Sequence, residues 1–248
     1  MRPLRGIIPP LATALASIDT LDLPGLERLI EHVLGGGVHG LFILGTTGEG
    51  PALSYRLRRE LIERVCAQVA ARVPVLVGIT DSAYIESLQL AEFSAKAGAS
   101  AVVAATPFYF RFGQSDILRW IERLAKDSPL PLYLYNQPEL TKISFEPETV
   151  ARLAAAAPNI QAIKEASGKV PQIAEIVHLV PRGFKIFSGD DNLALAAIGV
   201  GAHGLISVAS NEAPAEVSRM IRAALENNWA EARDLERRRF DPRLGRGK

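Results

Sequence analysis

One lysine in this chain lies where a lysine is costly. Lys164 is inside the apolar segment IQAIKEA (160–166), whereas the other six lysines lie in polar helices, loops or strand starts. A buried ammonium group costs free energy unless it is paired or loses its proton. A desolvated lysine amine attacks ketones to form Schiff bases. Two interpretations remain open: Lys164 is a nucleophile, or it lines the core paired with an acid such as Glu165.

Two of the five tyrosines stand at the ends of apolar segments. Tyr109 follows Thr106-Pro107, and Tyr135 comes near the end of LPLYLYN (130–136). A phenol beside a Schiff-base lysine can carry protons between amine, carbinolamine and product. Each ring could equally be an amphipathic cap on the fold.

Hydroxyl and carboxyl groups follow two further segments. The loop GTTGEG (45–50) lacks the glycine patterns that bind nucleotide phosphates. The hydroxyls and free N–H groups of Thr46 and Thr47 suit a small carboxylate instead. Asp190 and Asp191 could bind substrate hydroxyls or a cation, but no histidine is near them in the sequence, so we expect no dedicated metal site.

Composition excludes several classes of protein. Hydrophobic residues make up 48% and charged residues 22%, which predicts a large core, and a net charge of +1 gives no field that would attract nucleic acid. The single cysteine, Cys66, excludes an internal disulfide, and its amphipathic setting predicts a buried thiol. Pro9 and Pro10 interrupt the N-terminal apolar run, and no window is apolar enough to span a membrane, so we expect a cytoplasmic protein.

The elements that would position these groups repeat along the chain. Most apolar segments are hydrophobic on both faces, as in parallel strands covered on both sides, and segments of helical periodicity lie between them. A β–α unit of about thirty residues predicts a closed (β/α)8 barrel, with a doubly wound open sheet as the alternative. Strand ends then meet at one rim. The eight predicted strands are 7–13, 40–45, 73–79, 101–107, 130–136, 160–166, 184–190 and 204–208.

Five motifs occur in one order along the chain. They are GTTGE (45–49), TPxY (106–109), YNxP (135–138), IKEASG (163–168) and SGDD (188–191). With them, the chain from about residue 6 to about residue 235 resembles the dihydrodipicolinate synthase/N-acetylneuraminate lyase family of class I aldolases. The resemblance implies a TIM barrel that joins or cleaves pyruvate, or a related 2-oxo acid, and an aldehyde. It further implies a homodimer or homotetramer with no metal or nucleotide cofactor.

Residue roles follow from the resemblance. Lys164 would form the imine, and Tyr135 would be the general acid and base. Thr46 and Tyr109 would complete a hydroxyl relay with Tyr135. In family members the tyrosine equivalent to Tyr109 often enters the active site from a neighbouring subunit. Thr46 and Thr47 would bind the carboxylate of pyruvate. Further substrate contacts would come from Gly189, Asp190, Leu140 and the backbone carbonyl of Ile206.

The chain departs from the family pattern in two places. Synthases of the family carry an arginine where this chain has Leu140, and the point charge of Lys142 does not reproduce a bidentate clamp, so the aldehyde stays open. Family members also continue into a helical C-terminal domain. We therefore expect a barrel at 1–225 and, at 226–248, a remnant of that domain, with a helix break near Asn227-Asn228 and a disordered basic tail.

Three alternatives to the synthase stay open. A 2-keto-3-deoxy sugar-acid aldolase or dehydratase, or an enzyme like N-acetylneuraminate lyase, would use the same imine. A barrel that binds a 2-oxo acid without catalysis would explain the missing arginine. A phosphate-binding barrel is disfavoured, because Asp190, Asp191 and Glu212 would repel phosphate.

Overall fold

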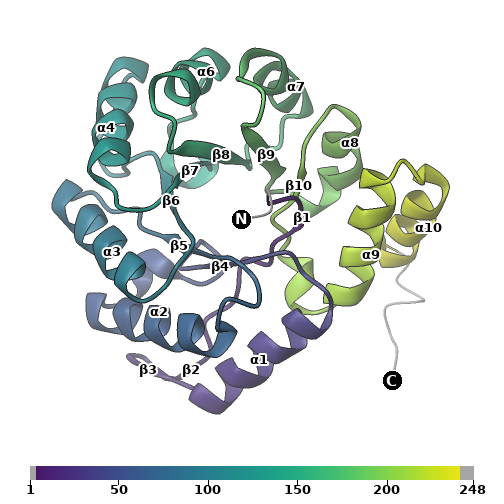
Figure 1. The fold of residues 1–248 in the computed structure, drawn as a ribbon, viewed down its shortest axis with the longest axis horizontal. Helices are drawn as coiled ribbons and strands as arrows, with labels where there is room; N and C mark the ends of the chain where they lie inside the picture. The colour runs from purple at the N-terminus through teal and green to yellow at the C-terminus, as the bar shows by residue number, and fades with distance from the viewer. Residues whose placement is uncertain (1–3, 241–248) are drawn as a thin grey trace.

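The computed structural model describes residues 4–240 and has the architecture of a (β/α)8 barrel (Figure 1). Eight parallel strands form the inner ring, and helices surround it. The barrel strands are β1 (Gly6–Ile7), β4 (Leu41–Ile43), β5 (Val75–Gly78), β6 (Ala101–Ala105), β7 (Leu132–Asn136), β8 (Ile160–Glu165), β9 (Lys185–Ser188) and β10 (Gly204–Leu205). The helices are α1 (Leu23–Gly35), α2 (Tyr55–Val69), α3 (Tyr84–Lys96), α4 (Gln114–Asp127), α5 (Pro138–Thr141), α6 (Pro147–Ala156), α7 (Val170–Leu179), α8 (Ala194–Gly199), α9 (Pro214–Leu225) and α10 (Trp229–Phe240).

Hydrogen bonds close the sheet into a barrel. The strand order is β1-β10-β9-β8-β7-β6-β5-β4, and a parallel bridge between Pro10 and Phe42 joins its two edges. At this seam Phe42 donates to the carbonyl of Pro9 and accepts from Leu11 N–H, each at 2.8 Å. The closed barrel is therefore confirmed, and the open-sheet alternative is wrong.

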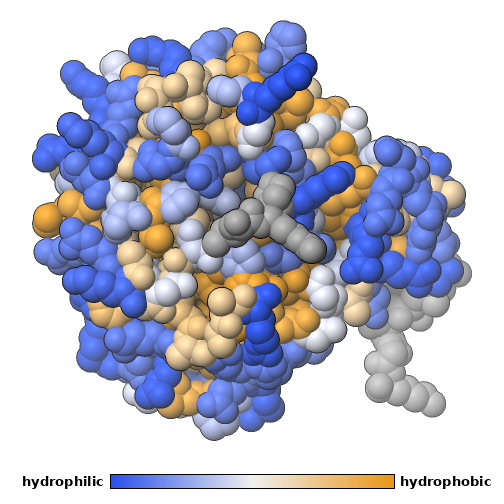
Figure 2. All heavy atoms as spheres, viewed as in Figure 1, coloured by the Kyte–Doolittle hydropathy of each residue, from blue (hydrophilic) through white to orange (hydrophobic). Residues whose placement is uncertain are grey.

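The strands are buried on both faces, as their apolar sequences predict. One face fills the barrel interior, and the other packs against the helices. Hydrophilic side chains cover most of the outer edge of the molecule, with hydrophobic ones further in (Figure 2). The buried side chains of the interior include Ile8, Phe42, Leu76, Val103, Tyr133, Tyr135, Phe187 and Ile206.

A short hairpin after the first strand was not predicted. β2 (Leu15–Ser17) pairs antiparallel with β3 (Thr20–Leu21). All three residues of β2 are exposed, and only Leu21 of the hairpin is buried, so the hydrophobic pattern carries almost no signal for it.

The C-terminal segment forms two helices. Asn227, with φ of 63°, lies between α9 and α10, as expected for a break at Asn227-Asn228. Ala232 is buried, and the Arg219 and Glu231 side chains form a 2.6 Å ion pair that joins the helices. The domain boundary at 225/226 stays a prediction, and residues 241–248, the predicted tail, lie outside the described residues.

Within residues 4–240 no helix combines the length and apolar character needed to cross a membrane. Cys66 is buried, as predicted, and burial raises the pKa of its thiol to about 11.

Two histidines near the start of strands are held in the neutral form. Nδ1 of His39 accepts the Ile7 N–H, and Nδ1 of His203 accepts the Ile186 N–H, each at 3.2 Å. Protonation would turn each acceptor into a donor that faces another donor. Both rings therefore make acid costly to the fold.

We expect stability to fall as pH drops from 6.5 toward 4. Burial, followed by the charges of Lys185 and Arg5, lowers the pKa of His203 to about 4. Below pH 6.5 His203 becomes protonated in the unfolded chain but stays neutral in the folded one. The free energy of unfolding should therefore decrease by on the order of 2 kcal/mol as the pH falls toward 4. Urea unfolding across this range measures it. His203→Asn, whose amide oxygen can still accept from Ile186, should flatten the profile; an unchanged profile would contradict the assignment.

Candidate active site

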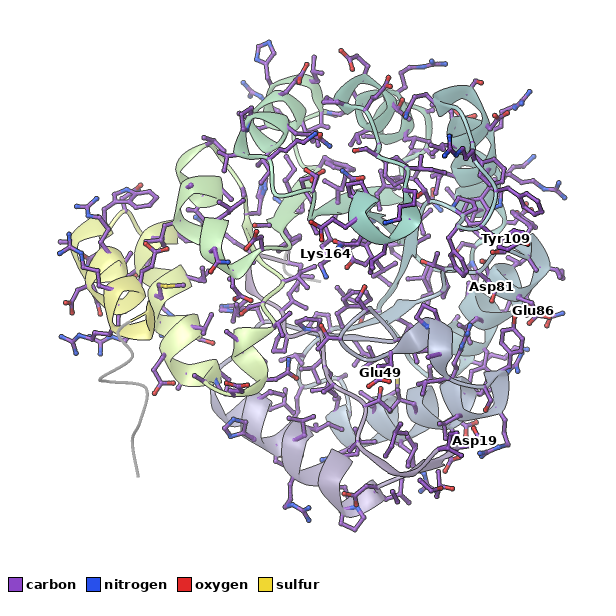
Figure 3. All side chains as sticks on the ribbon, turned by 180° about the vertical axis from the view of Figure 1, so that it is seen from behind. Asp19, Glu49, Asp81, Glu86, Tyr109 and Lys164 are labelled. Carbon is purple, nitrogen blue, oxygen red and sulfur yellow. The ribbon has the colours of Figure 1, made fainter. Side chains whose placement is uncertain are left out.

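Lys164 is buried in the barrel, and no described carboxylate is its ionic partner. Its side chain points from β8 toward the barrel axis (Figure 3) and is 5% exposed as a residue. Nζ lies 4.2 Å from the centre of the Tyr135 ring and 5.4 Å from that of Phe42. Within residues 4–240 no carboxylate forms an ion pair with it. Two aromatic rings therefore pack against the amine, and no described carboxylate holds it in an ion pair.

Glu165 is not the partner of Lys164. Adjacent strand residues point to opposite faces, and Glu165 lies between the strands and the helices. Its carboxylate accepts from Asn136 at 2.7 Å, from Gln172 at 3.1 Å and from the Ser167 N–H at 2.7 Å. The interpretation that pairs Lys164 with Glu165 is therefore wrong.

Tyr135 and Thr46 are in direct contact. The phenol oxygen of Tyr135 lies 3.1 Å from Oγ1 of Thr46, and either group can donate. Tyr135 is opposite Lys164 in the register of β7 and β8, and its ring packs edge-on against Phe42. A chain of two hydroxyls therefore begins beside the amine, as a proton relay requires.

The loop that carries Thr46 and Thr47 begins with an unusual backbone. Leu44 has φ of 57°, a left-handed conformation that is costly outside glycine. Its carbonyl approaches β5 so closely that a Cβ on Gly78 would lie 2.3 Å away. The conformation is therefore fixed by the packing around it.

The same loop leaves donors free. Its internal hydrogen bonds are Glu49 N–H to Thr46 O and Gly50 N–H to Gly45 O. In the described part of the chain, the N–H groups of Thr46 and Thr47 donate to no backbone or side-chain acceptor. Free N–H groups beside a hydroxyl can bind a carboxylate.

A cavity of about 300 Å³ opens above Tyr135. Leu140 lines it, at the position where the resemblance expects an arginine. Lys142 does not replace that arginine, because its ammonium donates to the carbonyl of Glu139. The residues around the cavity are Phe42, Leu44, Gly45, Thr46, Gly50, Pro51, Arg58, Gly78, Thr80, Val103, Ala105, Phe108, Tyr135, Gln137, Leu140 and Thr141.

Arg58 at this cavity was missed from the sequence. It is 8% exposed, and it donates to the carbonyls of Leu53 and Pro51 and forms a 3.4 Å ion pair with Asp81. Its position, three and four residues before Leu61 and Ile62, places it on the buried face of α2. That spacing is the signal that could have found it.

Gly189 lies against the Lys164 side chain. A Cβ at this position would be 2.9 Å from Cε of Lys164 and 2.5 Å from Cβ of Ala166. Gly189 and Asp190 line a second hollow of about 290 Å³, which shares Gln137 with the first. The absence of a side chain at Gly189 therefore leaves room for the amine.

The remaining predicted site residues are placed differently. Ile206 is buried in the barrel interior, and among the described residues its carbonyl accepts no hydrogen bond. Thr47 is half-buried on the loop. Tyr109 is 86% exposed with φ of 87°, and its ring meets that of Phe110 edge to face at the rim, away from Lys164 (Figure 3).

One described chain therefore does not bring Tyr109 to the relay. Its entry from a neighbouring subunit stays a prediction, as do the other roles assigned to single residues. Among the described residues no three His, Cys, Asp or Glu side chains gather as metal ligands would. The prediction that the chain uses no metal or nucleotide stays a prediction as well.

Comparison with known proteins places the chain in a family. The model of the dihydrodipicolinate synthetase family matches residues 3–241. A 4-hydroxy-tetrahydrodipicolinate synthase of Acidobacterium capsulatum is 40% identical over 238 residues, which are 96% of this chain and 79% of that protein.

Solved structures agree with this match. The dihydrodipicolinate synthase of Bacteroides thetaiotaomicron superimposes with a TM-score of 0.91 at 40% identity, covering 95% of this chain and 79% of that one. YagE of E. coli K12, a protein of the dihydrodipicolinic acid synthase family solved in complex with pyruvate, gives 0.92 at 30% identity, covering 96% and 80%. The predicted resemblance is confirmed: the chain belongs to the dihydrodipicolinate synthetase family.

Proposed function

We propose that this chain is a lyase or synthase that binds pyruvate as a Schiff base on Lys164. The observation that carries the proposal is the buried amine of Lys164, which lacks an anionic partner among the described residues and lies over the ring of Tyr135. The Tyr135–Thr46 contact supplies a proton path beside it. The pyruvate complex of YagE supports pyruvate as the first substrate.

The first step forms the imine. Nζ of Lys164 attacks C2 of pyruvate. The nitrogen loses a proton and the carbonyl oxygen takes one, which gives a carbinolamine. That hydroxyl leaves as water after a second protonation, which leaves a C=N bond to Lys164. The phenol of Tyr135 supplies protons through Thr46, and the Thr46 and Thr47 N–H groups hold the carboxylate.

The second step uses the imine as an electron sink. The methyl group of pyruvate loses a proton to give an enamine, and the enamine carbon attacks an aldehyde. Water then hydrolyses the imine, releases the product and restores the amine. Cleavage of a C–C bond is the same sequence in reverse.

For the aldehyde, a synthase of the kind named among the relatives is our leading proposal. Relatives at 35–40% identity are 4-hydroxy-tetrahydrodipicolinate synthases. A second candidate, a sugar-acid aldolase or dehydratase, is favoured by one observation: Leu140 faces the cavity and Lys142 turns away from it. Turnover of aspartate semialdehyde against uncharged hydroxyaldehydes, each with pyruvate, separates the two candidates.

The setting of the reaction is also a proposal. We infer a homodimer or homotetramer, because Tyr109 reaches no relay group within one described chain and its exposed ring is available to a neighbour. Pyruvate and an aldehyde are the proposed partners, and nucleic acid is not. We propose the cytoplasm as the location.

Borohydride trapping tests the proposal. With pyruvate present, reduction should fix a pyruvyl group on the peptide that contains Lys164, found by mass mapping. Without pyruvate the peptide should keep its unmodified mass. A folded protein that gives no adduct, or an adduct on another lysine, would contradict the proposed function.

A further inference from the structure

A buried polar cluster lies directly behind the catalytic pair. Asn136 and Glu165 follow Tyr135 and Lys164 along β7 and β8, so their side chains point away from the barrel interior. The register pairs Tyr135 with Lys164 and Asn136 with Glu165. Asn136 is fully buried and Glu165 is 2% exposed, and neither side chain belongs to the cavity where substrate would bind.

Neutral donors surround the carboxylate of Glu165. Asn136 and Gln172 donate to one oxygen, at 2.7 and 3.1 Å, and the Ser167 N–H donates to the other at 2.7 Å. Within residues 4–240 no cation forms an ion pair with it. A buried carboxylate is tolerated only when its lone pairs are satisfied, so this cluster permits very little displacement.

The cluster also fixes the segment that follows β7. Oδ1 of Asn136 accepts the Phe145 N–H at 3.0 Å, and Gln172 donates to the Phe145 carbonyl at 3.1 Å. This segment carries Leu140 and Thr141 into the cavity wall. One set of hydrogen bonds therefore ties together two strand ends, α7 and part of the cavity wall.

We propose that Glu165, with Asn136 and Gln172, positions Lys164 and Tyr135 for imine formation and proton transfer. The proposal rests on the proposed function of Lys164. The cluster acts through the backbone, because each of its strand residues is the next residue after a reacting one. A misplacement of about 1 Å between reacting groups can cost about 100-fold in rate.

Two single substitutions break the cluster in different ways. In Glu165→Gln an amide N–H must face either Ser167 N–H or the Asn136 and Gln172 donors. In Asn136→Asp two carboxylates meet. We expect each change to lower kcat by about 10- to 100-fold and to slow borohydride trapping at Lys164, with KM for pyruvate within about twofold of wild type.

The double variant Asn136→Asp/Glu165→Gln tests whether the bond between the strands matters. The introduced amide at 165 can donate to the introduced carboxylate at 136, which reverses the hydrogen bond between the strands and leaves the Gln172 N–H facing the new amide. We expect kcat of the double variant to exceed that of the worse single variant by about tenfold, a coupling that independent effects do not give.

A matched control lies immediately before β8 begins, at the end of the strand opposite Lys164. Asn159 donates from its side chain to the Ala125 carbonyl, so Asn159→Asp creates an acceptor conflict of the same kind away from Lys164. It should lower the melting temperature and leave kcat unchanged. Gln172→Ala, a milder change at a half-buried position, keeps the test available if a cluster variant does not fold; we expect about a threefold loss of kcat.

The outcomes separate the two proposals. Wild-type protein without a pyruvyl adduct on Lys164 would overturn the proposed function, and this inference with it. Wild type with the adduct, and folded variants with wild-type kcat, would overturn only the positioning role. The same holds if Asn159→Asp loses as much kcat as Asn136→Asp, or if the double variant shows no recovery.

Discussion

Replacement of Lys164 by methionine is expected to abolish turnover, by at least about 10⁴-fold, while the fold is kept. Methionine has a similar length and no amine, so no imine can form. Because Lys164 has no ionic partner among the described residues, its removal leaves no unpaired carboxylate behind. The melting temperature should therefore be no lower than that of wild type. Steady-state kinetics and thermal unfolding monitored by circular dichroism measure the two effects.

Lys185→Met is the matched control for this change. Lys185 begins β9, the strand next to β8, at the opposite end of the barrel from the cavity that Tyr135 lines. The Lys185→Met variant should keep wild-type kcat. Retained activity in Lys164→Met would contradict the catalytic role. A fold lost in that variant alone would show that Lys164 has a structural role instead.

Tyr135→Phe should reduce kcat by about 10²- to 10³-fold. The change removes one hydroxyl, with its contact to Thr46, and keeps the ring that packs against Phe42. Imine formation needs proton transfers to and from the carbinolamine oxygen, so the rate of borohydride trapping should fall with kcat. Rapid-quench trapping with pyruvate alone measures this rate before any aldehyde is involved.

Tyr133→Phe provides the comparison on the same strand. Tyr133 also faces the barrel interior, is 9% exposed and lies two residues before Tyr135. With Lys185 it lines a separate cavity, one that Tyr135 does not line. Loss of its hydroxyl should leave kcat within about twofold of wild type. Equal losses in both variants would mean that kcat falls when any tyrosine hydroxyl in the barrel is removed. That result would contradict the proposed proton relay through Thr46.

The sequence predicts the fold well, because its signal is repeated. Strands that are apolar at both odd and even positions are typical of sheets covered on both faces. Eight such segments are compatible with few folds. The hairpin at Leu15–Leu21 escaped because its short strands are mostly exposed. Its antiparallel pairing depends on local geometry that the hydrophobic pattern does not contain.

The site is predicted less completely. Strand alternation alone separates Lys164 from Glu165, so the wrong pairing could have been avoided from the sequence. The contact of Glu165 with Asn136 requires the register of β7 and β8, which no local pattern gives. The direction of the Tyr109 side chain depends on the positive φ of this loop residue, which the residue type does not indicate.

The seam of the barrel has a consequence for the order of folding. β1 lies between β10, where Gly6 pairs with Gly204, and β4, whose Phe42 is bridged to Pro10 just after β1. The first barrel strand in chain order therefore gains its second neighbour only when the last barrel strand, β10, is in place. Closure is a long-range step that comes late, and until then the edges of β1 and β10 are open to pairing with another chain.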